Sequence, residues 1–173
     1  MQDKMRGALV CGALGLIALG EHADAQTCAP SIVAVNPTSA YSVTAGVVVD
    51  GRSGLMWDQC AWGQSGLNCA SGSGGLYSWN QALAIPATAN LSVYKGYADW
   101  RLPNVKELLS LVEVCRINPS INDIVFPATP PSYFWSGSPI AGSSAWSVYF
   151  DIGFPYSSNR GYFLHVRLVR AGQ

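Results

Sequence analysis

The chain has 173 residues, of which 49% are hydrophobic and 12% charged, and its ten basic and ten acidic residues give a net charge of zero. A chain of this length is expected to form one domain with its own hydrophobic core. The balanced charge provides no field over the whole surface that would attract a polyanion, so the composition argues against nucleic acid as a partner.

Residues 1–25 have the pattern of a secretory signal peptide. Lys4 and Arg6 precede the apolar run GALVCGALGLIALG, and Ala23 and Ala25 occupy the small positions of an Ala-x-Ala cleavage site. The run is shorter than the roughly 20 residues that a helix needs to cross a bilayer. We therefore predict cleavage after Ala25, no membrane span after cleavage, and a protein that is secreted, periplasmic or at the cell surface.

Four cysteines remain after this cleavage, and an even number in an exported protein favours two disulfides. The segment CAWGQSGLNC is a glycine-rich loop that can fold back on itself, so we predict the pair Cys60–Cys69, which leaves Cys28–Cys115. There is no Cys-x-x-Cys pair, and His165 is the single histidine after residue 25. The spacing therefore argues against zinc, and we predict neither a metal nor a cofactor.

The first predicted elements are two strands in a hairpin. Residues 26–40 are expected to be an N-terminal extension, and residues 41–173 the domain. Within the domain, Val47 to Val49 and Leu55 to Trp57 are β-rich runs separated by the turn sequence DGRSG. The following segment, AWGQSGLNCASGSGGL, is rich in Gly, Ser and Asn, which predicts a surface loop held by the Cys60–Cys69 bridge.

Two helices follow in the prediction. Ser78 is a suitable N-cap for the first, which should end or kink near Ile85 because Pro86 follows. Asn104 is a suitable N-cap for the second, with Glu107 completing a capping box. The second helix carries an apolar stripe that faces the core: Val105, Leu108, Leu109, Val112 and, in continuation, Cys115.

A short strand, ADWRL, is predicted between these helices. Asp99 and Arg101 lie two residues apart in it and should share one face, where they can pair with each other or fix the neighbouring turn. We expect this role to be architectural rather than ligand-binding.

The C-terminal part is predicted to hold an irregular segment and then strands. RINPSINDIVFPATPPS is interrupted by four prolines, and strands are expected at YFWSGS, AWSVYFDIG and YFLHVRLVR. The last two strands should be antiparallel and joined through the turn FPYSSNRG. In AWSVYFDIG, the inward side is expected to carry Trp146, Val148, Phe150 and Ile152.

Several of these segments, taken in this order, resemble the Lcl C-terminal domain family, named for a bacterial collagen-like adhesin. They are SGLMW, the Trp-x-x-Ala pair at Trp79, GYADWRLPNVKEL, FP at Phe126, YFWSGS, AWSVYF and VRLVR, and the resemblance covers roughly residues 41–171. The family is similar to C-type lectin-like domains. This resemblance implies an α+β fold with a mixed or antiparallel sheet, two flanking helices and a long irregular loop region.

The resemblance also implies that the first and last strands pair, here Leu55 to Trp57 with His165 to Arg170. It implies extracellular binding or adhesion, in the founding case to sulfated glycans. The chain has no Gly-x-y repeats, so collagen-driven trimerisation is not implied.

The sequence gives little support for catalysis. A nucleophile–histidine arrangement would have to use His165, which we expect on the solvent-facing or hydrogen-bonded side of its strand, and no Gly-x-Ser-x-Gly elbow is present. The formylglycine-generating enzymes share a lectin-like core and use cysteine chemistry, but here disulfides are the expected use of the cysteines. A calcium site is not supported either, since Asn118, Asn122 and Asp123 are expected to make turns.

The aromatic residues provide the remaining indication of function. Five tryptophans fall on patterned elements and are expected to pack in the core: Trp57, Trp79, Trp100, Trp135 and Trp146. Loops carry binding sites on rigid scaffolds, and the segments 130–144 and 154–161 are expected to meet. These two segments, together with residue 162 directly after the second, supply a candidate ligand site made of Tyr133, Tyr156, Asn159, Arg160 and Tyr162.

We therefore predict a secreted, non-catalytic binding or adhesion module whose partner is a glycan or a surface protein. The alternative is a structural protein–protein interaction domain in a cell-envelope or particle assembly. The five site residues also have a purely structural interpretation, in which they cover the edge of the core and order the turn.

Overall fold

The computed structural model describes residues 28–172, and these form an α+β domain with two antiparallel sheets. The first sheet has the order β1-β2-β3-β7, with β1 at Tyr41–Thr44, β2 at Val47–Asp50, β3 at Leu55–Asp58 and β7 at Val169–Ala171. The second has the order β4-β5-β6, with β4 at Tyr133–Pro139, β5 at Ser144–Tyr149 and β6 at Phe154–Asn159.

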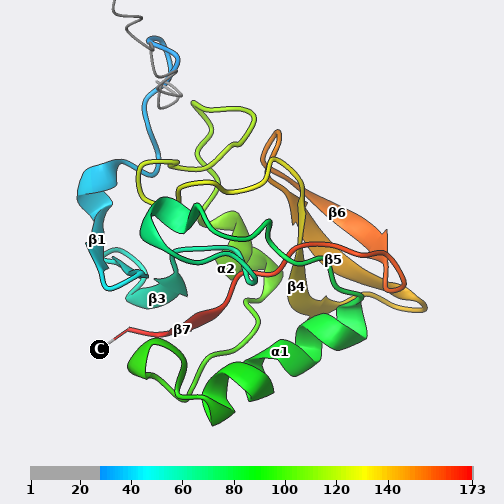
Figure 1. Cartoon of the computed structure of the whole chain (residues 1–173). Helices are drawn as coiled ribbons and strands as arrows, with labels where there is room; N and C mark the ends of the chain where they lie inside the picture. The colour runs from blue at the N-terminus through cyan, green and yellow to red at the C-terminus, as the bar shows by residue number, and fades with distance from the viewer. Residues whose placement is uncertain (1–27, 173) are drawn as a thin grey trace, which may run out of the picture.

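The two sheets lie on opposite sides of the molecule (Figure 1). Between them lies α2 (Val105–Leu109), and α1 (Trp79–Leu91) runs along one end. Three short 3-10 helices complete the elements of this part of the chain: η1 (Thr38–Ala40), η2 (Leu67–Cys69) and η3 (Tyr94–Gly96). In residues 28–172, the structure contains no helix with the length and apolar character needed to span a membrane. The predicted signal peptide lies outside the described residues.

The predicted hairpin is confirmed, and so is the pairing of Leu55 to Trp57 with the end of the predicted strand His165 to Arg170. Strands β2 and β3 pair antiparallel around the DGRSG turn, and β3 pairs with β7 in the register Met56↔Arg170 and Trp57↔Val169. The structure adds one strand that we did not predict, β1, which pairs with β2 at the edge of the sheet. The predicted single sheet is wrong, since β4 to β6 form a separate one.

The predicted partner of β5 is also wrong. The segment FPYSSNRG was expected to be a turn, but its first six residues form β6, which pairs with β5 from Ser144↔Asn159 to Tyr149↔Phe154. β6 lies at the edge of its sheet in the described chain. No further strand there requires the backbone N–H that Pro155 lacks, so a proline is tolerated at this position. Because of this pairing, the buried side chains of β5 differ from those predicted to face inward. Ser147 is buried, Trp146 is only half-buried, and Ile152 is 44% exposed in the turn that follows.

The segment YFLHVRLVR runs between the two sheets instead of beside β5. His165 exchanges backbone hydrogen bonds with β4 (N to Tyr133 O, 3.0 Å), and Val166 O accepts one from Trp62 N at 2.8 Å. Both faces of residues 164–170 are therefore covered, and all seven are buried. The expected alternation of buried and solvent-facing side chains fails for this reason, and His165 is buried.

Arg167 is the most deeply buried charge of this segment. Its guanidinium donates to the carbonyl oxygens of Asp58 (2.9 Å) and Gln59 and to Oγ1 of Thr129 (2.7 Å), and it lies 4.9 Å from the centroid of the Phe126 ring. Burial lowers the pKa of Arg167 to about 10, so the side chain is still a cation at neutral pH. These contacts offset part of the cost of burying that charge and join the segment to the loop after β3.

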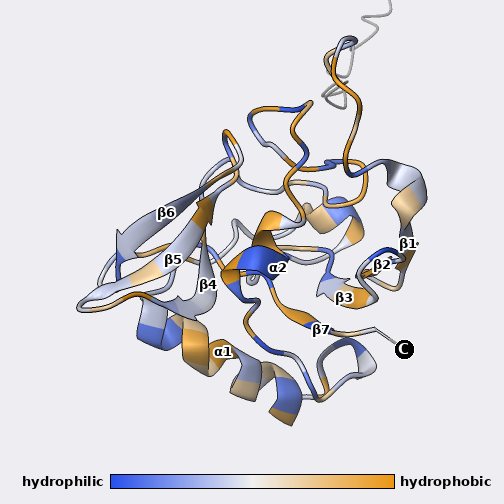
Figure 2. Ribbon diagram, turned by 180° about the vertical axis from the view of Figure 1, so that it is seen from behind, coloured by the Kyte–Doolittle hydropathy of each residue, from blue (hydrophilic) through white to orange (hydrophobic). Residues whose placement is uncertain are grey.

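Helix α1 begins where the sequence predicts but continues past its proline. Ser78 and Gln81 form a capping box, with Ser78 N donating to Gln81 Oε1 at 2.9 Å. We predicted an end or kink near Ile85, yet the helix includes Pro86 and reaches Leu91. The buried face, formed by Trp79, Ala82, Ile85 and Ala89, extends on both sides of the proline, so tertiary packing outweighs the hydrogen bond that Pro86 removes. Figure 2 shows hydrophilic and hydrophobic residues alternating around this helix.

Helix α2 has the predicted cap but is shorter than its apolar stripe. Asn104 Oδ1 accepts from Glu107 N at 2.9 Å, and Asn104 N donates to Glu107 Oε2 at 2.8 Å. The helix ends at Leu109, and Val112 already bridges to Ile121 in an antiparallel pairing. Leu108 has no exposed surface, as predicted, and Leu111 joins it in the core.

The predicted strand ADWRL is reduced to one bridge, between Arg101 and Val169. Its two charged residues have an architectural role, but they do not pair with each other. Asp99 accepts two hydrogen bonds from Arg170 (2.6 and 3.1 Å), and Arg101 forms a bidentate pair with Glu107 (2.7 Å for both bonds). The segment thus joins the last strand to the cap of α2.

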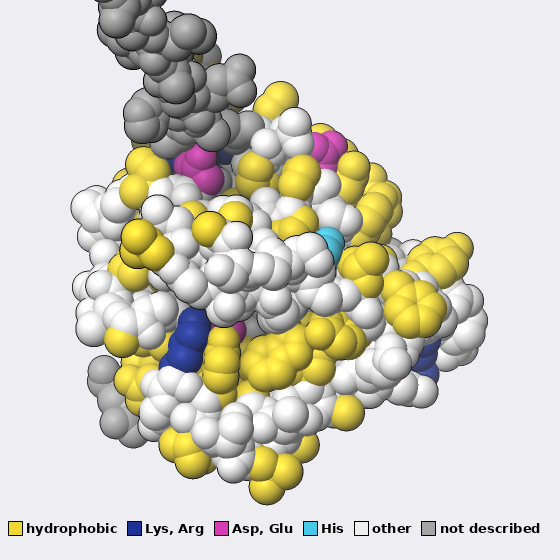
Figure 3. Space-filling view, viewed as in Figure 1, with side chains coloured by type: hydrophobic (Ala, Val, Ile, Leu, Met, Phe, Trp, Pro, Cys, Tyr) yellow, Lys and Arg dark blue, Asp and Glu magenta, His cyan; other side chains and the backbone are white. Residues whose placement is uncertain are grey.

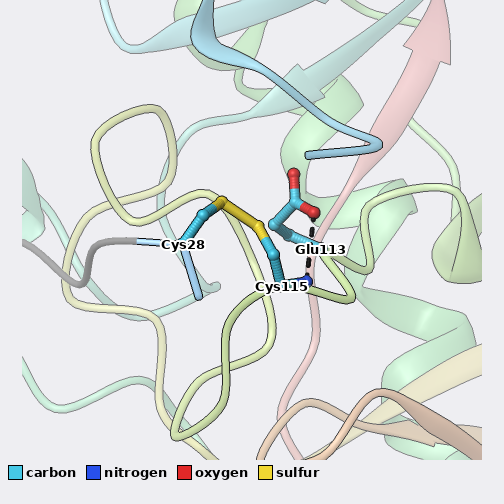
Figure 4. Close-up of side chains that lie close together, drawn as sticks. All are labelled: Cys28, Glu113 and Cys115. Carbon is cyan, nitrogen blue, oxygen red and sulfur yellow. Dashed lines mark hydrogen bonds between the residues drawn. A yellow bond between two sulfur atoms is a disulfide. The ribbon is translucent and has the colours of Figure 1, made fainter. Parts of the chain in front are cut away.

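Both predicted disulfides are present. Cys60–Cys69 closes the glycine-rich loop, and Cys28–Cys115 fixes the N-terminal extension to the segment after α2. Beside the second bridge, Glu113 accepts a hydrogen bond from the backbone N–H group of Cys115 at 3.3 Å (Figure 4). It accepts two more from the backbone N–H groups of Val35 (3.0 Å) and Asn36 (2.8 Å). The extension is therefore an integral part of the described domain.

Candidate functional site

Three of the five predicted site residues line one hollow on the surface of the second sheet. Tyr133 comes from β4, Tyr156 from β6, and Tyr162 from the turn after β6. The hollow has a volume of about 280 Å³. We call it the tyrosine hollow, and its lining residues are Tyr133, Tyr156, Ser157, Ser158, Tyr162 and Leu164.

The tyrosines belong to an ordered aromatic group. Tyr133 stacks on Tyr149, its partner across the β4–β5 ladder, with ring centroids 4.2 Å apart and an interplanar angle of 10°. Tyr156 stands edge-on to both rings, at 5.4 Å from Tyr133 and 6.0 Å from Tyr149. The cross-strand registers hold all three side chains on one face of the sheet, so the rings are positioned before any ligand arrives.

The site side chains differ in their access to solvent. Tyr133 is half-buried, Tyr156 is 39% exposed and Tyr162 is 61% exposed. Several hydrophobic side chains are exposed on the side of the molecule where β6 and the segment after it lie, and a larger group lies at the centre of the same view (Figure 3). Rings that are exposed and yet fixed by neighbours can offer flat apolar faces, together with hydroxyl groups that both donate and accept hydrogen bonds.

The other two predicted residues, Asn159 and Arg160, have structural contacts in the same turn. Asn159 Oδ1 accepts from Gly161 N at 2.9 Å, and Asn159 O accepts from Tyr162 N at 2.9 Å. The guanidinium of Arg160 donates to the carbonyl oxygens of Ser144 (3.0 Å) and Ile140 (3.1 Å) and lies 4.3 Å from the centroid of the Trp79 ring. Neither residue lines the tyrosine hollow, and their contacts order the turn that presents Tyr162.

Sequence reasoning missed Tyr149, which supports the site from behind Tyr133. The sequence does indicate the face on which Tyr149 lies, because it follows Ser147 by two residues and residues two apart share one face of a strand. The register between β4 and β5 was needed to place Tyr149 opposite Tyr133. Burial and the nearby carboxylate of Asp151 raise the pKa of the Tyr149 hydroxyl above its ordinary value. Leu164 was also missed, since it belongs to the segment that lies between the sheets.

A second aromatic hollow, with a volume of about 340 Å³, lies beside the disulfide loop. Trp62 and Tyr94 form its walls, with ring centroids 5.2 Å apart, and Gly63, Gln64 and Ser65 complete it. Next to it, Lys95 Nζ donates to Asp58 Oδ1 at 2.6 Å and to Gly46 O at 2.6 Å, which engages the cation internally. Gln64 is likewise bonded through both ends of its amide, so this hollow offers fewer available polar groups.

His165 lacks the surroundings of a catalytic base. It is 8% exposed, its Nδ1 has no hydrogen-bond partner in the described part of the chain, and burial lowers its pKa. Its ring packs against Phe134, with centroids 5.2 Å apart. In the described part of the chain, no polar group therefore orients the imidazole through Nδ1.

One group among residues 28–172 has the composition of a metal site: Cys28, Glu113 and Cys115, whose ligand atoms lie within 4.8 Å of one another. The two sulfur atoms are joined in the disulfide, and the carboxylate accepts three backbone hydrogen bonds, so the group is a structural staple (Figure 4). In the INPSIND segment, Asn122 donates to Asn36 O at 3.0 Å, and Asp123 pairs with Arg116. Both side chains have protein partners.

These features define an α+β domain with two antiparallel sheets, two disulfides and an exposed aromatic hollow on the smaller sheet. The Lcl C-terminal domain family matches residues 46–170 of the chain. The protein therefore belongs to the Lcl C-terminal domain family. No curated protein matches the chain as a relative.

Proposed function

We propose that the protein is a non-catalytic extracellular binding module that recognises a glycan through the tyrosine hollow. The observation that carries the proposal is the convergence of Tyr133, Tyr156 and Tyr162 from three separate segments on one hollow. A contiguous group of exposed apolar side chains is a more frequent sign of a ligand or partner site than exposed residues that are scattered singly. Rings with flat faces and hydroxyl groups suit sugar rings, which present both C–H faces and hydroxyls.

The location and fold belong to the same proposal. Two disulfides are typical of an oxidising compartment, which supports a secreted, periplasmic or cell-surface location. The pairing of β3 near the start of the domain with β7 at its end supports a C-type lectin-like arrangement. The engaged cysteines and the buried His165 support a role without catalysis.

The proposal is tested with the chain from residue 26 immobilised on a glycan array. We expect retention of at least one glycan class, loss of that binding in Tyr156→Ala and Tyr162→Ala, and unchanged binding in Phe163→Ala. Phe163 is a matched control, because it is 61% exposed like Tyr162 but does not line the tyrosine hollow. Binding that survives both tyrosine substitutions in folded protein would place the ligand elsewhere.

A second candidate function is protein–protein contact in an envelope assembly, and the edge of the smaller sheet favours it. β6 pairs with β5 alone, and Phe154 at its start is 59% exposed. An edge strand with exposed apolar residues can accept another chain. A photo-crosslinking residue at position 154 should then yield one defined crosslinked protein in the native envelope, whereas uniform labelling of many proteins would argue against this function.

A further inference from the structure

The charges around the tyrosine hollow restrict what it can bind. Its lining residues in the described chain are tyrosines, serines and one leucine, without any Lys or Arg. The nearest basic residue along the chain is Arg160, whose guanidinium is held by two carbonyl oxygens and the Trp79 ring. To reach a sulfate in the hollow, it would have to give up these contacts and the turn that they order.

The charge that acts on the aromatic group is an acid. Asp151 lies two residues after Tyr149 in the turn between β5 and β6 and raises the pKa of the Tyr149 hydroxyl, and Tyr149 stacks on Tyr133, which lines the hollow. A sulfate or carboxylate placed against these rings would approach this carboxylate without a cation to compensate it. Electrostatic complementarity, which decides between similar ligands, therefore disfavours anionic sugars here.

The polar groups of the hollow are neutral and few. Tyr156 and Tyr162 present hydroxyl groups that donate and accept, and Ser157 is exposed beside them. Ser158 is already engaged, since its hydroxyl bonds to Ser147 Oγ at 2.7 Å. A volume of about 280 Å³ is just below the usual range for ligand sites, roughly 300–1,000 Å³, so the hollow suits one or two rings of a chain.

We infer that the tyrosine hollow takes an uncharged sugar ring and selects against its sulfated or carboxylated counterpart. This inference rests on the proposed function, and it goes beyond it by naming the ligand class. It also separates this chain from the sulfated-glycan binding that resemblance to the founding member implies. The neutral ring would lie against Tyr156 and Tyr162, with their hydroxyls bonding to its own.

The test compares matched pairs of oligosaccharides, each neutral sugar with its monosulfated form, by titration calorimetry at 50 and 500 mM NaCl. The neutral forms should bind, with dissociation constants that differ less than about twofold between the two salt concentrations, because no ion pair is screened. The sulfated forms should bind at least about threefold more weakly at low salt, and high salt should narrow that gap. Tyr162→Ala should abolish binding of the neutral form, and Phe163→Ala should leave it unchanged.

Three results would overturn the inference, and they differ in whether the proposed site and the proposed function would still hold. Tighter binding of the sulfated form that weakens with salt and depends on Tyr162 would refute neutral selection while the proposed site stands. Lys106 is an exposed cation on α2 that does not line the tyrosine hollow. Tighter binding of the sulfated form that is lost in Lys106→Ala but not in Tyr162→Ala would move the site to another surface. Absence of binding to either member of every pair, with the fold intact, would overturn the proposed function and the inference with it.

Discussion

Replacement of Leu108 by alanine tests how α2 is packed between the two sheets. Leu108 has no exposed surface and belongs to the core group that contains Leu111, Phe134 and Val148. The substitution removes three carbon groups, which at about 0.8 kcal/mol each corresponds to about 2.4 kcal/mol of lost transfer free energy. The cavity that remains brings the expected loss of unfolding free energy to about 2–5 kcal/mol.

The assay is urea denaturation followed by circular dichroism, with the disulfides intact. Leu91→Ala is the matched control, because the same side chain is 88% exposed at the end of α1 and its removal should change the unfolding free energy by less than about 0.5 kcal/mol. The melting temperature of Leu108→Ala should fall by roughly 4–20 °C, at 2–4 °C per kcal/mol for a domain of this size. Equal effects of the two substitutions would show that the stripe of α2 does not face the core.

Three further predictions concern the helices. Asn104→Ala should lower the unfolding free energy by about 1 kcal/mol through loss of the cap, and a change no larger than that of an exposed substitution would contradict the capping box. Burial raises the pKa of Glu107, but its bonds to Arg101 and the N–H of Asn104 lower it more, so the net pKa lies below 4.5. A lowered carboxyl pKa contributes stability that is full above pH 4.5 and is lost as the pH falls through the pKa of the folded state. Glu107→Gln should therefore reduce the loss of unfolding free energy on acidification, and an unchanged loss would refute this. Pro86→Ala should restore the missing bond to Ala82 O and raise the unfolding free energy by roughly 1–3 kcal/mol, and a decrease measured by urea denaturation would mean that the ring's packing matters more.

The parts of the fold that local chemistry dictates were predictable from the sequence. The caps at Ser78 and Asn104, the hairpin around DGRSG and the Cys60–Cys69 bridge follow from short-range patterns, and the Cys28–Cys115 bridge then follows by elimination; the structure contains each of them. The family resemblance added the pairing of β3 with β7, which no local signal indicates.

The errors arose where long-range contacts decide the conformation. β6 contains Pro155 and two serines and has no apolar alternation, so its strand character comes from pairing with β5. Helix α1 passes through Pro86 because its buried face continues beyond it. The alternation in YFLHVRLVR predicts a half-buried strand, yet this segment lies between two sheets, and the periodicity of one segment does not report on two layers of neighbours.

The candidate site was predictable in part for the same reason. Tyr156 and Tyr162 stand out as aromatic residues in a polar segment, and Tyr133 follows from the segment expected to meet them. Arg160 was chosen for its charge, and the sequence does not reveal that the carbonyl groups of Ile140 and Ser144 approach its guanidinium. Tyr149 required the β4–β5 register.

The central claim is that the aromatic hollow on the smaller sheet holds the ligand, and aromatic NMR of the tyrosine-labelled chain tests it most directly. On addition of a neutral oligosaccharide that binds, the account predicts shifts of the ring signals of Tyr133, Tyr156 and Tyr162, with those of Tyr41 and Tyr97 unchanged. Saturable binding that shifts Tyr94, beside the Trp62 hollow, and leaves those three tyrosines unchanged would contradict the account.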